Sequence, residues 1–245
     1  MQIHQILKRG FGHKNHCEDY VLVNNNNPHF LLAAAFDGCS SGTESFFASA
    51  LFGKTLQNCF RNLDNNNTLL NTSELLYNIT SELMKQVYEI HKLLGTNNNE
   101  MLTTAIILIL DKRNKNGSIF CAGDGVISIN GVVHKINQNN QPDYPAYYFN
   151  TITNTEDFTE WYHQKNKIIH FTQGSDISIS TDGIESFTAE NDIEKNITTD
   201  AIIAYLVSDT FLAGNKAMLS RKCNILKNNH TVENFDDLGM VRIIT

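Results

Sequence analysis

The stretch "FLLAAAFDGCSSG" at residues 30–42 places an acid at the end of a strongly apolar segment. Its apolar first half has the length and composition of a buried strand. Asp37, Gly38, a cysteine and two serines then follow. An Asp-Gly pair with serines is ordinary turn chemistry, so a turn is one interpretation of this stretch. Whether the acid does more depends on where the other acids of the chain fall.

The composition is that of a globular protein that can bury a substantial core, with 245 residues, 41% apolar and 18% charged. No internal repeat or linker is apparent, so we expect one domain over residues 1–245. The net charge of −7 argues against nucleic acid as the main partner, because phosphate backbones need a basic surface. The same acidity suits a site that binds cations.

The sequence predicts a cytoplasmic protein without a membrane partner. The N-terminus "MQIHQILKRGFG" lacks the apolar segment of a signal peptide, and the apolar stretches near 30–36 and 105–110 are too short to span a bilayer. No C-x-x-C spacing occurs, so we expect free thiols in a reducing compartment and no zinc site. The five cysteines are Cys17, Cys39, Cys59, Cys121 and Cys223.

The predicted strands come in hairpins and do not alternate with helices. Segments 20–23 and 30–36 flank one loop, and segments 126–129 and 132–136 flank Asn130-Gly131, a type I′ turn signal. This order favours an α+β fold with antiparallel sheets over a doubly wound parallel sheet. Further strands are predicted at 104–110, 118–121, 168–171, 177–180 and 241–244.

Two long helices are predicted after the first hairpin. Ser41-x-x-Glu44 has the capping-box pattern for the first helix, and Thr72 or Ser73 would cap the second. Two shorter helices are expected at 199–207 and 215–226, whereas 137–167 is expected to be loop with one short element. The apolar stripes are Phe52, Leu56, Cys59 and Leu63 in the first helix, and Leu76, Ile79, Leu83, Val87, Ile90 and Leu94 in the second.

Two acids are expected to converge at the open end of the first hairpin. If the loop is centred near residues 26–27, Glu18 lies opposite about residue 35, which makes Asp37 its near neighbour. Like charges at close range repel and raise a pKa unless a cation neutralises them. A bound metal is the simplest interpretation.

Other strand ends carry acids as well. Asp124 follows the strand at 118–121, Asp182 follows the strand at 177–180, and Asp236 with Asp237 precedes the last strand. Carboxylate oxygens select Mg²⁺ or Mn²⁺ over soft metals. Two such ions are the usual apparatus for hydrolysing a phosphate ester.

Six segments, in order along nearly the whole chain, resemble motifs of the bacterial-type PP2C (PPM) family of metal-dependent protein serine/threonine phosphatases. No single motif is specific, and the order and spacing carry the resemblance. The segments are "KNHCED" at 14–19 (R-x-x-N-E-D), "FDG" at 36–38 (V-[AFY]-D-G), "LTTAIILIL" at 102–110 (G-T-T-A), "CAGDG" at 121–125 (V-G-D-S), "STDGIESF" at 180–187 (S-D-G-L-x-D) and "DDLGMVRI" at 236–243 (D-D-[IN]-[TS]).

The resemblance implies a four-layer αββα sandwich, in which two antiparallel sheets pack face to face between helix pairs. It also implies two central Mg²⁺ or Mn²⁺ ions and a third, weaker one. The implied roles are Asp37 as the bridge between the two ions, the Gly38 carbonyl as a ligand to one of them, Glu18 on the second ion, Asp182 and Asp236 on the first, Asp124 with Asp182 on the third, Asp19 orienting the attacking water, and Lys14 at the position of an arginine that grips phosphate.

Several positions depart from the family pattern. Lys14 keeps the charge of the usual arginine but loses its bidentate fork, so we expect a weaker grip on phosphate. Cys39 stands where animal members carry a histidine thought to protonate the leaving group, so the general acid is not assigned. His13 and His16 lie close in sequence, but a lone histidine is more often a surface residue. Cys17 replaces the usual Asn and Gly125 the usual Ser, and 137–167 corresponds to the variable flap.

The activity implied by the resemblance is hydrolysis of phosphoserine or phosphothreonine in proteins by water that two metal ions activate. The implied partners are phosphorylated proteins that a cognate serine/threonine kinase modifies. One alternative is a weak or inactive PP2C-like domain that binds phosphoproteins or other partners, against which the intact set of acids argues. Another is a metal-dependent phosphoesterase on an unrelated fold, which the motif order disfavours.

Overall fold

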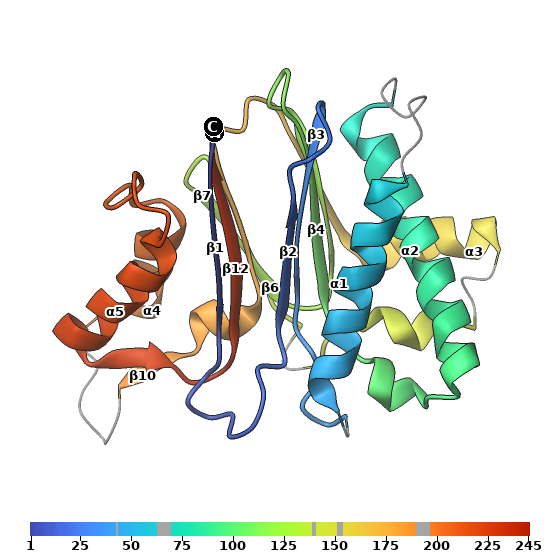
Figure 1. Ribbon diagram of the computed structural model, residues 1–245, viewed down its shortest axis with the longest axis horizontal. Helices are drawn as coiled ribbons and strands as arrows, with labels where there is room; N and C mark the ends of the chain where they lie inside the picture. The colour runs from blue at the N-terminus through green and yellow to red at the C-terminus, as the bar shows by residue number, and fades with distance from the viewer. Residues whose placement is uncertain (43, 63–69, 139–140, 151–153, 190–196) are drawn as a thin grey trace.

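The computed structural model describes residues 1–42, 44–62, 70–138, 141–150, 154–189 and 197–245. Two five-stranded antiparallel sheets lie at its centre (Figure 1). In spatial order the first sheet contains β1 (Gln2–Lys8), β12 (Leu238–Ile244), β9 (Asp176–Ser180), β6 (Gly125–Ile129) and β7 (Val132–Ile136). The second contains β2 (Tyr20–Asn24), β3 (Phe30–Phe36), β4 (Ala105–Asp111), β5 (Gly117–Ala122) and β8 (Lys167–Phe171).

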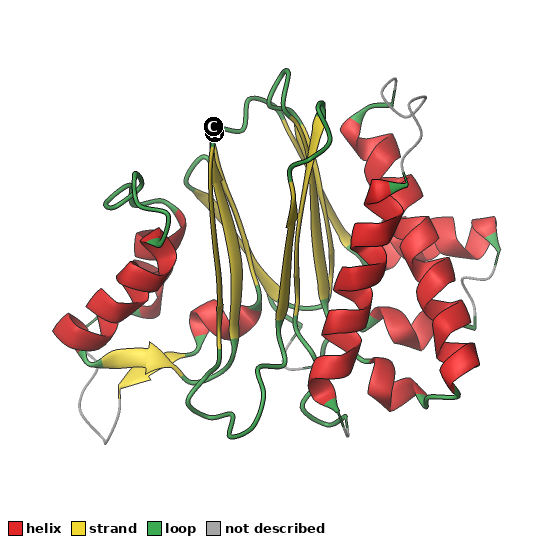
Figure 2. Cartoon of the chain, in the orientation of Figure 1, coloured by secondary structure: helices red, strands yellow, loops and turns green. Residues whose placement is uncertain are grey.

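Helices cover both outer faces of the sheet pair. The pair α4 and α5 lies on the first sheet, and α1 with α2 lies on the second (Figures 1 and 2). This arrangement confirms the α+β sandwich with two antiparallel sheets. The helices are α1 (Ser45–Arg61), α2 (Thr72–Leu94), α3 (Thr155–Glu160), α4 (Thr199–Val207) and α5 (Met218–His230), with short helical turns η2 (Asn98–Met101), η3 (Pro145–Tyr148), η4 (Trp161–Lys165, a π-helix) and η5 (Asp182–Glu185).

Alternation along the strands separates the core into layers. In β3, Leu31 and Ala33 pack between the two sheets, whereas Leu32 and Ala34 pack under α1 and α2. Because both faces of this strand are covered, all seven of its residues are buried. The apolar run that the sequence shows at 30–36 is therefore a central strand of a sandwich.

The helix starts differ from the capping patterns that the sequence suggested. The capping box at Ser41 is wrong, because α1 begins at Ser45 and its N-cap, Glu44, makes no side-chain capping bond. In α2 the N-cap is Asn71 and not Thr72 or Ser73 as predicted, and it forms a capping box with Glu74. Leu63 lies outside the described residues.

The apolar stripe of α2 is buried over most of its length but not at its end. Leu76, Ile79, Leu83 and Val87 are buried, Ile90 is half-buried and Leu94 is exposed. Within the described residues, no helix combines the length and the apolar character needed to cross a membrane. All five cysteines are unpaired, which confirms the prediction of free thiols.

Several elements were not predicted. The segment 137–167 contains η3, α3 and η4, more than the one short element expected. Strand β1 pairs with β12 over seven residues, and a small sheet joins β10 (Phe187–Ala189) to β11 (Val232–Asn234). The hairpin β6–β7 has the predicted turn, with positive φ at both Asn130 and Gly131.

Candidate active site

The candidate site lies between the two sheets at one end of the sandwich. Odd-numbered residues of β2 and β3, such as Val21 and Ala33, face the first sheet. Asp19 and Asp37 continue these two rows just outside the strands, so the alternation directs both toward the space between the sheets. The loop that joins β1 to β2 lies below this end in Figure 1.

Asp19 links the two sheets. Its side chain is buried, and its Oδ2 accepts a hydrogen bond from Oγ1 of Thr181, directly after β9, at 2.7 Å. Its Oδ1 is also buried and receives no hydrogen bond from the described residues. A buried carboxylate oxygen without a donor is costly, and a cation would remove that cost.

Asp37 is held in place by its backbone. Its N–H donates to Oγ1 of Thr104 at 3.1 Å, and its carbonyl accepts from the N–H of Thr104 and from Oγ1 of Thr103, both at 2.8 Å. The two threonines of the "LTTA" motif therefore fix the peptide that carries the candidate bridging carboxylate.

The carboxyl groups around Asp37 repel one another. Burial raises the pKa of Asp37 well above its usual value, and the charges of Asp19, Asp182 and Asp236 raise it further. Burial, followed by the charges of Asp236 and Asp124, raises the pKa of Asp182 to about 6. These shifts have the sign expected for acids gathered without a counter-charge, which a divalent cation would supply.

Glu18 lies beside Gly38, and not opposite residue 35 as expected. Tyr20 pairs with Phe36, and the N–H of Gly38 donates to the carbonyl of Glu18 at 3.2 Å. The hairpin prediction is therefore wrong by three residues in register, although the two acids are still adjacent. A Cβ on Gly38 would lie 2.1 Å from a backbone oxygen of α1, so a glycine is required for the helix to start this close.

The carboxylate of Glu18 is oriented by two serines. Ser40 donates its hydroxyl to Oε2 at 2.6 Å, and Ser45 donates to Oε1 at 2.5 Å. Neither contact is visible as a local pattern in the sequence, since the serines follow Glu18 by 22 and 27 residues. Both lie where α1 approaches the end of β3, so their role depends on the packing of that helix.

Three of the predicted metal ligands line one pocket of about 280 Å³. Asp124 is fixed in it by the N–H of Gln138, which donates to its Oδ1 at 2.7 Å. Burial raises the pKa of Asp124 and of Asp236. The lining residues are Asp124, Ile136, Asn137, Asp182, Glu185, Ser186 and Asp236.

Glu185 is an additional acid of this pocket that sequence reasoning missed. It follows Asp182 by three residues, and the short helical turn η5 brings both to the same pocket. Its Oε1 lies 3.2 Å from Nζ of Lys135, which also contacts Asp200 at 2.6 Å. The spacing of three residues was the available sequence signal.

His13 lies against the two acids that precede β12. Its Nδ1 is 2.8 Å from Oδ2 of Asp237, and its Nε2 is 3.4 Å from Oδ1 of Asp236. Burial alone would lower the pKa of His13, but the close contact with Asp237 and the nearby negative charges raise it. Asp237 also accepts from the backbone N–H groups of Gly10 and Glu18, so it anchors the loop between β1 and β2.

Lys14 and His16 occupy the exposed part of this loop. The backbone carbonyl of Lys14 accepts a hydrogen bond from Nη1 of Arg9 at 2.8 Å, so the side chain of Arg9 ties this part of the loop to the end of β1. The exposed ring of His16 packs on Phe46 with ring centroids 4.7 Å apart. His13 is therefore the histidine of the pair that contacts the acids.

The residues present fit a hard divalent cation. Within the described parts of the chain, no three His, Cys, Asp or Glu side chains are placed so that they could hold one ion as they stand. The candidate donors are nevertheless all carboxylates and one carbonyl, and Asp19 keeps a buried oxygen without a donor. This chemistry matches Mg²⁺ or Mn²⁺ and not a soft metal.

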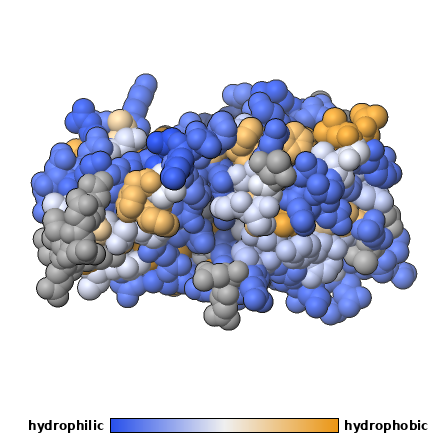
Figure 3. Space-filling model, turned by 90° about the horizontal axis from the view of Figure 1, so that it is seen from below, coloured by the Kyte–Doolittle hydropathy of each residue, from blue (hydrophilic) through white to orange (hydrophobic). Residues whose placement is uncertain are grey.

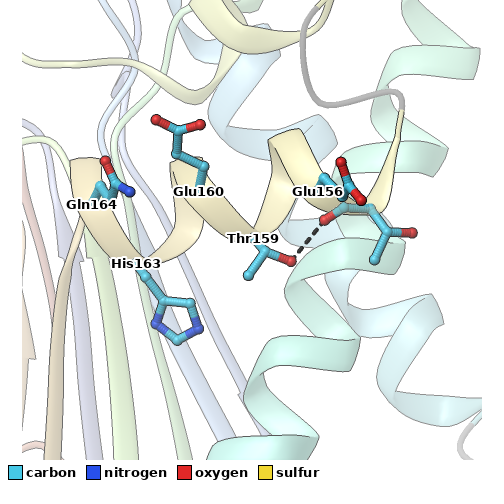
Figure 4. A pocket seen from close by; sticks show the side chains of 6 residues that line it. Glu156, Thr159, Glu160, His163 and Gln164 are labelled. Atoms are coloured by element: carbon cyan, nitrogen blue, oxygen red, sulfur yellow. Dashed lines mark hydrogen bonds between the residues drawn. The ribbon is translucent and has the colours of Figure 1, made fainter.

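In a second pocket, on the surface of α3 and η4, the polar side chains do not point toward a common centre. It measures about 430 Å³ and includes Glu160 and His163. These two side chains point to opposite sides of the helix, while Thr159 donates its hydroxyl to the carbonyl of Thr155 at 2.7 Å (Figure 4). The surface of α3 and η4 is therefore not a candidate active site.

Comparison with known families agrees with the geometry. The family model described as protein phosphatase 2C matches residues 11–216. The chain therefore belongs to the protein phosphatase 2C family, whose members are protein serine/threonine phosphatases, which confirms the resemblance noted in the sequence. No curated protein sequence matches the chain.

Solved structures show the same fold at low sequence identity. A bacterial serine phosphatase carrying one substitution is 13% identical, with a TM-score of 0.66 over 100% of this chain and 98% of that one. RsbX in complex with magnesium is 16% identical, with a TM-score of 0.54 over 98% and 92%. The phosphatase domain and a regulatory fragment of SpoIIE from Bacillus subtilis are 14% identical, with a TM-score of 0.58. The match to SpoIIE covers 100% of this chain but only 63% of the SpoIIE chain.

Proposed function

We propose that this chain is an active, metal-dependent phosphatase that hydrolyses phosphoserine and phosphothreonine in proteins. The observation that carries the proposal is the gathering of six aspartates and two glutamates at one end of the sandwich, with a buried oxygen of Asp19 left without a donor among the described residues. Family membership supplies the reaction class.

The proposal assigns each acid a task. Glu18, Asp37, the Gly38 carbonyl, Asp182 and Asp236 would hold two Mg²⁺ or Mn²⁺ ions, and Asp124 with Asp182 a third. Bound ions would lower the pKa of a coordinated water and offset the charge of the phosphate. Asp19, fixed by Thr181, would orient that water, and Lys14 would contact the phosphate oxygens. The solved complex of RsbX with magnesium supports this choice of metal.

We extend the proposal to the chain as a whole. Residues 1–245 would form one catalytic domain, and its substrates would be phosphoproteins made by a serine/threonine kinase. The five unpaired cysteines support a reducing compartment, for which we propose the cytoplasm.

A second candidate function is a weak or inactive domain that binds phosphoproteins. It is favoured by one feature of the site: Glu18 is engaged by two serines and Asp236 by His13. If these contacts hold the acids apart, an ion would bind poorly.

Hydrolysis of p-nitrophenyl phosphate and of a phosphoserine peptide, with Mn²⁺, with Mg²⁺ and after EDTA, separates the two candidates. We expect hydrolysis of both substrates that requires the metal and vanishes with EDTA. Full activity after exhaustive chelation would contradict the mechanism. Peptide binding without hydrolysis under every metal and pH tested would favour the binding domain.

A further inference from the structure

Two phenylalanine rings form an exposed apolar pair at the rim of the site. Phe11 is 42% exposed and Phe235 is 52% exposed. Their ring centroids are 5.1 Å apart at an interplanar angle of 88°, the favourable edge-to-face arrangement. The molecule seen from below is mainly hydrophilic, with apolar side chains gathered in a few separate patches (Figure 3).

The pair is held firmly by the backbone beneath it. The N–H of Phe11 donates to the carbonyl of Asn234 at 3.2 Å, and the N–H of Gly12 donates to the carbonyl of Phe235 at 2.8 Å. A Cβ on Gly12 would lie 2.8 Å from the ring of Phe235, so this ring rests against the glycine. The exposed rings are thus a fixed platform that binding would not need to order.

The platform adjoins the acids directly. Phe235 immediately precedes Asp236, which lines the acid pocket. Two residues after Phe11, His13 contacts both Asp236 and Asp237. A protein segment whose phosphate reaches the acids would therefore bring the residues next to that phosphate onto the two rings.

The charge of the same loop suits an anionic segment. Arg9 and Lys14 flank Phe11 in sequence, and Nη1 of Arg9 donates to the backbone carbonyl of Lys14 at 2.8 Å, so the Arg9 guanidinium lies on the same loop segment as Lys14. In a chain of net charge −7, two exposed cations beside a group of acids attract an anion locally. The two cations suit the phosphate of a phosphorylated segment, and the two rings suit an apolar side chain next to the phosphorylated residue.

We propose that Phe11 and Phe235 bind an apolar side chain adjacent to the phosphorylated residue and so select among phosphoprotein substrates. The proposal rests on the proposed function, because it gives that active site a substrate preference. One apolar side chain covering the exposed rings corresponds to a preference on the order of tenfold in kcat/KM.

Two phosphoserine peptides, with leucine or with alanine on both sides of the phosphoserine, test the preference. The measured quantity is the ratio of their kcat/KM values with Mn²⁺, which is internal to each protein variant. We expect this ratio to be about tenfold in favour of the leucine peptide for the unmodified chain and one- to twofold for Phe11→Ala. Phe11→Trp should retain the preference, because it keeps an aromatic ring at this position. Phe211→Ala is the matched control, because Phe211 is 57% exposed in the segment between α4 and α5 and should keep the full ratio.

The outcomes separate this inference from the proposed function. Metal-dependent hydrolysis of p-nitrophenyl phosphate with equal ratios in all variants would overturn the inference and leave the function intact. Absence of all hydrolysis would refute the proposed function. The affinities of the two peptides, fluorescently labelled, would then test the inference: a ratio that is the same in all variants would overturn it. A dimer seen by sedimentation that Phe11→Ala abolishes would also overturn it, since a second copy would then occupy the rings.

Discussion

At the scale of single residues, the site depends on acids whose charges are balanced in different ways. Glu18 has its donors in Ser40 and Ser45, and Asp19 has Thr181 for one oxygen only. Asp37 has neighbouring acids, which raise its pKa after burial has done so. The residue proposed to bridge two ions is thus surrounded by three other acids, Asp19, Asp182 and Asp236.

Replacing Asp37 by asparagine should lower kcat by at least about 10²-fold, because a metal-supporting carboxylate is lost. The metal-free variant should melt at the same or a higher temperature, since one of several repelling charges is removed. Calorimetric titration with Mn²⁺ should show the loss of a tight site. Asp157→Asn, at an exposed position of α3, is the matched control.

The bridge assignment has a direct counter-test in Asp124→Asn. That variant should keep the tight Mn²⁺ binding and lose only the weak site. Loss of a tight site in the Asp124 variant, with none in the Asp37 variant, would show that the bridge is assigned to the wrong residue.

Lys14→Ala should weaken the binding of a phosphopeptide substrate, whereas Lys14→Arg should improve it or leave it unchanged. The reason is that a guanidinium group matches the geometry of phosphate oxygens better than an ammonium group does. Values of KM and kcat for a phosphoserine peptide provide the measurement. An alanine variant with both constants untouched would refute a role for this side chain in binding phosphate.

At the scale of elements, a capping pattern in the sequence predicts the start of a helix only where no tertiary contact holds the backbone in another conformation. Asn71 accepts hydrogen bonds from the N–H groups of Ser73 and Glu74, and Glu74 returns one to the N–H of Asn71. The Ser41 pattern looked equivalent in sequence. There, the N–H of Cys39 donates to the carbonyl of Leu102, so the chain is tied to another segment and α1 starts later.

Asn71→Ala should destabilise the protein by about 1 kcal/mol, the usual cost of losing an N-cap. Urea unfolding should show a lower midpoint with an unchanged slope, and Asn71→Asp should restore most of the loss. Phosphatase activity under folded conditions should remain, because α2 does not contribute a predicted ligand. A midpoint unchanged by the alanine substitution would show that the cap has no energetic role.

At the scale of the whole molecule, the acids of the site oppose folding when no metal is bound. The pKa of Asp182 is raised from 3.8 to about 6, and the pKa values of Asp19, Asp37 and Asp236 are raised as well. Between pH 4 and 6 the folded chain therefore binds more protons than the unfolded chain, so the free energy of unfolding falls as the pH rises. Acids with lowered pKa values, such as Glu233, act in the opposite direction, because the stability that they contribute is present above their ordinary pKa and is lost as the pH falls.

The EDTA-treated protein should accordingly melt at a higher temperature at pH 5 than at pH 7, and Mn²⁺ at pH 7 should raise the melting temperature again. Calorimetric melting curves across this range provide the measurement, and Asp182→Asn should flatten the profile. A metal-free protein whose melting temperature rises from pH 5 to pH 7 would contradict the prediction.

The class of fold and most of the acids of the site could be predicted from the sequence alone, although Glu185 could not. Hairpin patterns, the Asn130-Gly131 turn and the buried strand at 30–36 are local properties, since strand period and turn chemistry are encoded in neighbouring residues. Asp37, Asp124, Asp182 and Asp236 were visible because each stands at the end of an apolar run. Strand β1 was hidden, because its polar residues obscure the alternation.

Which of these groups meet, and what surrounds them, depends on contacts between distant parts of the chain. The bond between Asp19 and Thr181, the contact of His13 with Asp237, and the edge-to-face rings of Phe11 and Phe235 each join segments that are far apart in the chain. No local pattern encodes such a pairing, because it depends on how two sheets pack and on the course of the loops between them. The orientation of the acids and the position of the Phe11–Phe235 pair beside them are therefore set only when the two sheets have packed together.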